Sequence, residues 1–250
     1  MQKILANLKI DAKEMKYVVL PVYGERRLSF YLAMEEYLAR HCNEPDLFFM
    51  WQVQPSVIFG RNQIVENEVN LAYCREHGIQ VYRRKSGGGC VYADQDNLML
   101  SYITSEDNVN IAFNNFMNML VLVLRQLGIE ATCTIHNDVM IGDKKVSGTA
   151  SYHLPGRSIV HGTLLYDTNM QHMLSSITPD PAKLHSKGIQ SVRQRITLLK
   201  DYVSLSLDEV KSHIRTTLCC GELMLTESDV ESVSQLEQAY LQQDFINIIS

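Results

Sequence analysis

The chain has 250 residues, of which 46% are hydrophobic and 20% are charged, and these values are ordinary for a globular protein. Its formal net charge of −5 argues against non-specific binding to nucleic acid or to an anionic membrane. No apolar run approaches the roughly 18 residues of a membrane span or looks like a signal peptide. The six cysteines lack the C-x-x-C spacing of zinc sites and are typical of free thiols in a reducing cytoplasm. We therefore expect a cytoplasmic protein that binds neither nucleic acid nor membranes.

Residues 1–16 carry mixed charge and little pattern, so we expect an N-terminal extension followed by a single domain over 17–250. Apolar alternation and short apolar runs predict strands, and a period of 3.6 residues predicts helices. The expected strands are 17–22, 47–53, 56–59, 79–83, 90–93, 98–104 and 158–166. The expected helices are 28–42, 69–77, 111–127, 170–177, 207–218 and 226–241. Because strands often follow one another directly, the pattern favours an α+β fold with a mostly antiparallel or mixed β-sheet flanked by helices.

Residues 83–92 (RRKSGGGCVY) join two expected strands and have the composition of an anion-binding loop. Three consecutive glycines remove every Cβ, so the backbone can approach a ligand closely and adopt positive φ. Successive N–H groups in such a loop form a concave anion site, and Arg83 and Arg84 can each grip a phosphate with two hydrogen bonds. The stretch favours a phosphate-bearing ligand held against a sheet. The alternative is a glycine-rich hairpin beside two solvated arginines, and the missing GxGxxG pattern argues against a dinucleotide fold.

A second polar cluster, 137–150, contains a tight hairpin at Gly142-Asp143. Lys145 lies on its second arm, near small residues that leave room for a ligand. Its ammonium group could neutralise both a carboxylate and a phosphate, since stabilisation of developing charge is usually the largest catalytic term. A solvated pair formed by Lys144 and Lys145 is the commoner arrangement.

Three further positions have two interpretations each. Asp138, beside Asn137 on the first arm, could hold Mg²⁺ together with phosphate oxygens or cap a turn. His161 could act as an acid or base, although a histidine in an apolar strand is more commonly a hydrogen-bonded core residue. Cys133 could be a nucleophile if its thiolate were activated, but a buried, inert thiol is the simpler interpretation.

Four ordered motifs with matching spacing closely resemble the lipoate–protein ligase family, which has the biotin/lipoate protein ligase catalytic domain. They are the glycine loop and the residues after it (83–94), the polar hairpin (137–150), the HGTLL segment (161–165) and a polar stretch that looks like the loop folded over the adenylate (187–196). The resemblance runs from about residue 17 to residue 202.

The resemblance implies a two-step, ATP-dependent, amide-forming ligase. Lipoate and ATP–Mg²⁺ would give lipoyl-AMP and pyrophosphate, and the lipoyl group would pass to a lysine of a partner. The partners would be lipoyl domains of 2-oxoacid dehydrogenase complexes or the glycine-cleavage H protein. By motif match, Lys145 would be catalytic and Asp138 would bind the metal. The residues expected to bind lipoate or ATP are Arg84, Ser86, Gly87, Gly88, Gly89, Cys90, Val91, Tyr92, Asn137, Asp138, Lys145, Gly148, Ala150 and His161.

The sequence departs from the family pattern at two points. Asp96 stands where the family has glycine, which puts the geometry of that turn in doubt. The tryptophan-rich segment that leads into the usual C-terminal accessory domain is not visible, so we expect that domain to be absent from the chain and possible as a separate accessory chain. A lipoyl or octanoyl transferase that performs only the transfer step is therefore an alternative. A non-catalytic sensor is a second alternative, and a biotin ligase is disfavoured because its glycine- and arginine-rich adenylate loop is absent.

Overall fold

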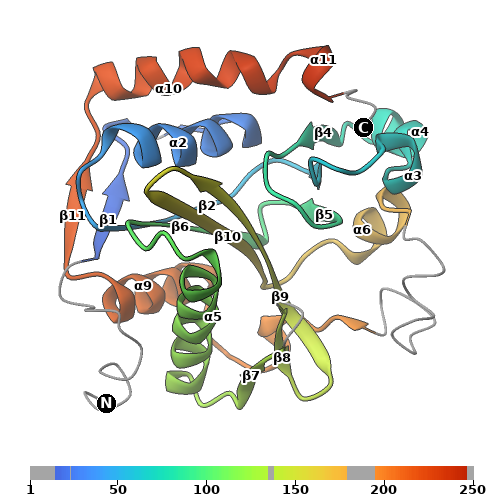
Figure 1. Ribbon diagram of the computed structural model, residues 1–250. Helices are drawn as coiled ribbons and strands as arrows, with labels where there is room; N and C mark the ends of the chain where they lie inside the picture. Colours follow the sequence, from blue (N-terminus) through green and yellow to red (C-terminus); the bar gives the residue numbers. More distant parts are fainter. Residues whose placement is uncertain (1–14, 23, 135–137, 179–194, 247–250) are drawn as a thin grey trace.

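The computed structural model describes residues 15–22, 24–134, 138–178 and 195–246 (Figure 1). Its larger sheet has eight strands, in the spatial order β11 (Gly221–Met224), β1 (Lys16–Val19), β2 (Asp46–Trp51), β6 (Asn97–Thr104), β10 (Arg157–Leu165), β9 (Lys144–Leu154), β8 (Asp138–Ile141) and β7 (Ala131–Cys133). β1 runs parallel to β2 and β11, and the other neighbours are antiparallel. The smaller sheet has the order β4 (Gln80–Arg83), β3 (Ser56–Phe59) and β5 (Cys90–Ala93). Mixed sheets flanked by helices confirm the predicted α+β class.

Helices cover both faces of the larger sheet (Figure 1). α2 (Leu28–His41) packs on one face, and α10 (Glu227–Tyr240) lies along α2. α5 (Val109–Gln126) and α9 (Leu207–Leu218) pack on the opposite face. The remaining short elements are α3 (Val65–Glu68), α4 (Leu71–Glu76), α6 (Met170–Ser176), α11 (Gln243–Ile246) and a 3-10 turn, η1 (Leu199–Asp201).

The central strands are apolar on both sides because each side has its own core. Ile159 of β10 belongs to the cluster beneath α2, whereas the adjacent Val160 belongs to the cluster beneath α5. Successive side chains in a strand point to opposite faces, so a strand covered on both sides reads as a continuous apolar run. The side of the sheet covered by α2 is the α2 face, and the side covered by α5 is the α5 face.

The predicted elements are present with shifts of a few residues at their ends, and the exceptions are short. The helix predicted over 69–77 is α4, whose N-cap Asn70 accepts a hydrogen bond from the backbone N of Tyr73. The short elements β7, β11, α3 and α11 were not predicted, because they contain few apolar residues and show neither a continuous apolar run nor a period. Met15 is completely buried and β1 begins at Lys16, so these two residues, which were assigned to the N-terminal extension, are part of the fold.

The glycine loop does not form a hairpin. β4 and β5 pair with opposite edges of β3 and not with each other. The loop between them therefore crosses the end of β3, next to Gly60.

In the part of the chain that the structure describes, no helix combines the length and apolar character that crossing a bilayer requires.

Candidate functional site

The glycine loop passes over the end of β3 with no room for an additional carbon atom. A Cβ on Gly60 would lie 2.1 Å from the carbonyl oxygen of Gly88. Gly88 has φ +89°, a conformation that favours glycine. The backbone N of Arg61 donates to the carbonyl oxygen of Ser86 at 3.0 Å, which ties the loop to the turn after β3. By contrast, an ideal Cβ on Gly87 or Gly89 would meet no described atom within 4 Å, so the described residues leave one side of the loop open.

The two arginines before the loop are buried, and the interpretation of solvated arginines is wrong. The Arg84 guanidinium donates to the carbonyl oxygens of Ile58 at 3.1 Å, Gly87 at 2.7 Å and Gly89 at 2.8 Å. Burial lowers the pKa of Arg84 to about 10, so the group stays charged at neutral pH. Arg83 packs its guanidinium over the ring of Phe59, 4.7 Å from the centroid. Both buried guanidinium groups therefore donate hydrogen bonds to backbone carbonyl oxygens. Direct contact of Arg84 with a ligand stays a prediction.

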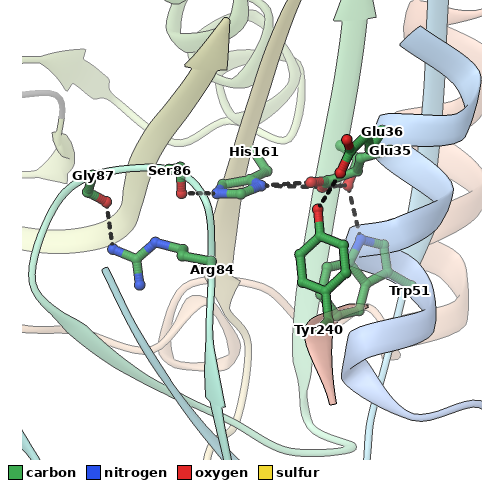
Figure 2. A network of polar contacts seen from close by, with 9 residues as sticks. Glu35, Glu36, Trp51, Arg84, Ser86, Gly87, His161 and Tyr240 are labelled. Carbon is green, nitrogen blue, oxygen red and sulfur yellow. Dashed lines mark hydrogen bonds and ion pairs between the residues drawn. The ribbon is translucent and has the colours of Figure 1, made fainter. Parts of the chain in front are cut away.

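Ser86 and His161, which were predicted separately, are joined in one buried network (Figure 2). Ser86 Oγ lies 2.8 Å from Nε2 of His161, and Nδ1 of that histidine lies 2.9 Å from Oε2 of Glu35. Ser101 Oγ also donates to Glu35, and Trp51 Nε1 donates to Ser101 Oγ at 2.8 Å. A buried carboxylate costs much free energy unless it is hydrogen-bonded. The network thus fixes the orientation of His161 behind the glycine loop.

Glu35 was not identified from the sequence, although a signal was present. In a helix, residue 35 shares one face with residues 28, 31 and 32, which are all apolar or aromatic. A glutamate on the apolar stripe of a helix must have a buried partner. Here that partner is His161, 126 positions further along the chain.

Lys145 and Asp138 form the second part of the site. Nζ of Lys145 lies 2.7 Å from Oδ1 of Asp138, and Nη2 of Arg195 donates to the other carboxylate oxygen. The Lys145 side chain lies over Gly148, where an added Cβ would be 2.5 Å from Nζ. The interpretation of Lys144 and Lys145 as a solvated pair is therefore wrong for Lys145, whereas Lys144 is exposed.

A β-bulge brings Lys145 to the α2 face. Ser147 pairs with Val139, but the next pair is Lys145 with Met140, so Val146 is an extra residue. Val146 is completely buried in the core beneath α5. If β9 alternated regularly through Val146, with no bulge, Val146 would point to the α2 face and Lys145 to the α5 face.

The two parts of the site meet along β9. Asp138 pairs with Gly148, and Ala150 pairs with His161, so these four residues share the α2 face. Gly148 and Ala150 are two residues apart, about 7 Å along a strand. The structure therefore brings the predicted residues Asp138, Lys145, Gly148, Ala150 and His161 together on one face of the sheet, where His161 contacts Ser86 of the glycine loop.

Two predicted positions in β5 lie away from the open side. Tyr92 is almost completely buried and packs in the core of the smaller sheet. Burial raises the pKa of the Cys90 thiol to about 12, so that cysteine stays protonated. Val91, between them, is partly exposed. Ligand contacts of these three residues stay predictions.

Cys133 is exposed, so the expectation of a buried thiol is wrong. It pairs with Val139, which belongs to the core beneath α5, and therefore lies on the opposite face from Asp138. Local desolvation raises the pKa of the Cys133 thiol above its ordinary value. A raised pKa reduces the thiolate fraction and disfavours a nucleophilic role.

Asn137 and most of the predicted adenylate loop (187–194) lie outside the described residues. Ile196, just after that segment, forms a parallel bridge with Lys145, and the backbone N of Thr197 donates to the Lys145 carbonyl oxygen at 2.9 Å. Ile196 and Thr197 therefore lie directly beside Lys145.

The departure from the family pattern at Asp96 lies in a hydrogen-bonded turn. Its backbone N donates to Oδ1 of Asp94 at 3.1 Å, and the other carboxylate oxygen of Asp94 accepts from Thr168 and Asn169. Burial and the neighbouring charges of Asp94 and Asp167 raise the pKa of Asp96. The turn thus forms without glycine.

Asp138 is the candidate metal ligand among the described residues, which contain no group of three or more histidine, cysteine or acidic side chains placed to hold an ion. Mg²⁺ usually keeps several waters and binds through one or two carboxylates plus substrate phosphates. One carboxylate beside a predicted phosphate site fits that mode of binding.

Comparison with known proteins gives consistent relatives. The family model of the lipoyl protein ligase A/B catalytic domain matches residues 28–219. The chain is 37% identical to lipoate-protein ligase LplJ of Bacillus subtilis over 218 residues, which cover 83% of this chain and 66% of that protein. It is 36% identical to lipoate–protein ligase 1 of Staphylococcus aureus, over 82% of this chain and 65% of that protein. The chain thus spans slightly less than two thirds of the length of these relatives.

Solved structures share the fold over nearly the whole chain. A bi-partite lipoate protein ligase of Thermoplasma acidophilum, studied with its E2 lipoyl domain, has a TM-score of 0.81 and 26% identity, covering 95% of this chain and 98% of that one. A lipoate-protein ligase A bound with ATP has a TM-score of 0.80 and 24% identity, covering 93% and 98%. Because the family model matches most of the chain, the protein belongs to the lipoyl protein ligase A/B catalytic domain family.

Proposed function

We propose that the chain is an ATP-dependent lipoate–protein ligase, which forms lipoyl-AMP and transfers the lipoyl group to a specific lysine. The observation that carries the proposal is the placement of Lys145 and Asp138 on the sheet face that also holds His161, behind a glycine loop with an open side. The relatives described as ATP-bound and lipoate-bound support this choice of substrates.

The chemistry needs a positively charged site for two anions. In the first step, a carboxylate oxygen of lipoate attacks the α-phosphorus of ATP, and pyrophosphate leaves. In the second step, a lysine amine of the acceptor attacks the carbonyl carbon of the mixed anhydride, loses a proton and displaces AMP. Lys145 would neutralise the carboxylate and the α-phosphate, and the loop N–H groups would bind phosphate oxygens. Positioning and charge stabilisation supply the acceleration.

Mg²⁺ would neutralise charge on the ATP phosphates. Asp138 would hold the ion together with phosphate oxygens. In the structure that carboxylate pairs with Lys145 and Arg195. When Asp138 holds the ion, the phosphates of ATP and the carboxylate of lipoate would pair with Lys145 and Arg195 in its place.

The acceptors would be lipoyl domains or the glycine-cleavage H protein. The Thermoplasma acidophilum ligase was studied together with its E2 lipoyl domain, which supports a lipoyl domain as the acceptor. That ligase is bi-partite, which supports a separate accessory chain as a further partner. A cytoplasmic location stays a prediction.

The experiment is a two-part assay of the purified chain with ATP, Mg²⁺ and lipoate. We expect pyrophosphate release, followed by a lipoyl-sized mass gain on an added lipoyl domain. Lys145→Ala should reduce pyrophosphate release by about 100-fold or more, since removal of one charge-stabilising group typically costs that much. Lys144→Ala, in the exposed neighbour, is the matched control and should retain activity. Equal loss in both variants, or none in Lys145→Ala, would contradict the role of Lys145.

The same assay separates the alternatives. No pyrophosphate, but modification from supplied lipoyl-adenylate, would identify a transfer-only enzyme. Binding without turnover would identify a sensor. Cys133→Ser should be nearly silent, because the thiol lies on the opposite sheet face from Asp138; a large loss would support a thiol-dependent transferase.

A further inference from the structure

The C-terminal segment, residues 220–246, contains α10 and α11 and contacts Arg83 and Lys85 at the start of the glycine loop. This segment lies outside residues 28–219, which the family model matches. Nε of Arg83 donates to the carbonyl oxygen of Ile246 in α11 at 3.1 Å. Nζ of Lys85 lies 2.6 Å from Oε2 of Glu36, and the hydroxyl of Tyr240 donates to the same oxygen at 2.9 Å. The two residues on either side of Arg84 are thus both tied to the C-terminal segment.

Glu36 is the centre of this arrangement. Its carboxylate is almost completely buried and also accepts two hydrogen bonds from Arg40, at 2.7 and 3.0 Å. Figure 2 shows the Tyr240 hydroxyl pointing at Glu36, next to Glu35 on α2. The Lys85 ammonium lies 4.8 Å from the centroid of the Tyr240 ring. The Lys85 ammonium therefore contacts both the Glu36 carboxylate and the face of the Tyr240 ring.

These contacts act on the loop through its backbone. Arg84 binds the carbonyl oxygens of Gly87 and Gly89, so the position of Arg84 sets the shape of the loop. The C-terminal segment holds the residues before and after it, Arg83 and Lys85. Three glycines have large conformational freedom, and a loop of this kind binds phosphate well only when its N–H groups are preorganised.

We propose that Tyr240 and Glu36 are positioning residues that order the glycine loop from the C-terminal helix α10. The kinetic part of this inference rests on the proposed ligase function, whereas the ordering of the loop does not. Neither residue is expected to touch a substrate. Their effect passes through Lys85.

The test compares two variants that each remove one phenol hydroxyl between α2 and α10. Tyr240→Phe removes the hydrogen bond to Glu36. Tyr37→Phe removes the hydrogen bond from the Tyr37 hydroxyl to Asp229, which joins the same two helices without involving the loop. Hydrogen–deuterium exchange of residues 84–89 reports loop order, and the KM for ATP reports its consequence. Lys85→Met breaks the same link from the loop side.

We expect Tyr240→Phe and Lys85→Met to speed exchange of the loop amides by about threefold or more, because local opening free energies set exchange rates. The KM for ATP should rise about three- to tenfold with a smaller change in kcat, as expected when binding geometry is lost. Tyr37→Phe should leave both unchanged. Equal exchange in the Tyr240 and Tyr37 variants would overturn the inference. If the wild-type chain shows no turnover, the ligase proposal fails, and the exchange result alone still decides whether the loop is ordered from α10.

Discussion

At the scale of single residues, Gly60 shows how closely the two backbone segments of the site approach. The carbonyl oxygen of Gly88 occupies the space that a Cβ on Gly60 would take, at 2.1 Å. Both atoms concerned are fixed to backbone, so a side-chain rotation cannot relieve the contact. The close approach is the reason that a glycine follows β3.

We predict that Gly60→Ala will displace the glycine loop. Forcing an extra carbon into a closely packed position typically costs about 1–3 kcal/mol, and the shift should lower pyrophosphate release by about tenfold or more. Urea unfolding and the pyrophosphate assay measure the two effects. Gly24→Ala is the matched control, since no described atom lies within 4 Å of its ideal Cβ. Activity of Gly60→Ala equal to that of Gly24→Ala would show that the loop has another position available.

At the scale of elements, α2 connects the site with the C-terminal helix through two adjacent glutamates. Glu35 faces His161, and Glu36 faces Lys85 and Tyr240. Consecutive residues on a helix are about 100° apart, so one helix turn serves two networks. α2 therefore couples the sheet, the glycine loop and α10.

We predict a pH-dependent contribution of Glu36 to stability. Burial would raise the pKa of its carboxyl, but hydrogen bonds from Lys85, Arg40 and Tyr240 outweigh burial and lower the pKa below 4.5. A carboxyl whose pKa is lower in the folded state adds stability above its ordinary pKa, and loses it as the pH falls through the lowered value. The difference in unfolding free energy between the wild type and Glu36→Gln should therefore be larger at pH 7 than at pH 3.

Urea unfolding of both proteins from pH 7 to pH 3 measures this difference. Glu231→Gln, at an exposed position of α10, serves as the control for a general change of charge. A Glu36→Gln difference that stays constant over the whole range would contradict a lowered pKa of Glu36.

At the scale of the whole molecule, the C-terminal segment completes the fold at its edge. β11 pairs with β1 along four residues, and the backbone N of Cys220 donates to the carbonyl oxygen of the completely buried Met15. Beyond β11, the cluster beneath α2 includes Leu225, Val233 and Tyr240. The segment therefore contributes a strand and part of one core.

We predict that a chain truncated after Cys220 will not fold cooperatively. Burial of one large apolar side chain contributes about 1.5–3 kcal/mol to the free energy of unfolding. Loss of Leu225, Val233 and Tyr240 would therefore remove an amount close to the whole unfolding free energy of a typical domain, about 5–15 kcal/mol. Circular dichroism during urea unfolding should show a broad transition or none. A sharp transition with the midpoint of the full chain would show that the segment is dispensable for folding.

Much of the fold and the family could be predicted from local patterns. The helix at 28–41 shows a period of 3.6 residues, and the strand at 56–59 is a short run of buried residues. Both patterns follow from side-chain burial and can be seen within a single stretch of sequence. The order and spacing of the glycine loop, the polar hairpin and the HGTLL segment identified the family, which the family model confirms. Short motifs are visible in a sequence because their chemistry needs neighbouring residues.

The arrangement of the site depends on pairings between distant positions, which no local pattern contains. The bulge at Val146 decides on which face Lys145 lies, and it arises from the register of β8 against β9. The contact of His161 with Glu35 joins residues 126 positions apart, and that of Tyr240 with Glu36 joins residues 204 apart. Such contacts form when the packed core excludes water, because buried polar groups must then find hydrogen-bond partners within the protein. Only the tertiary structure decides which distant residues become those partners.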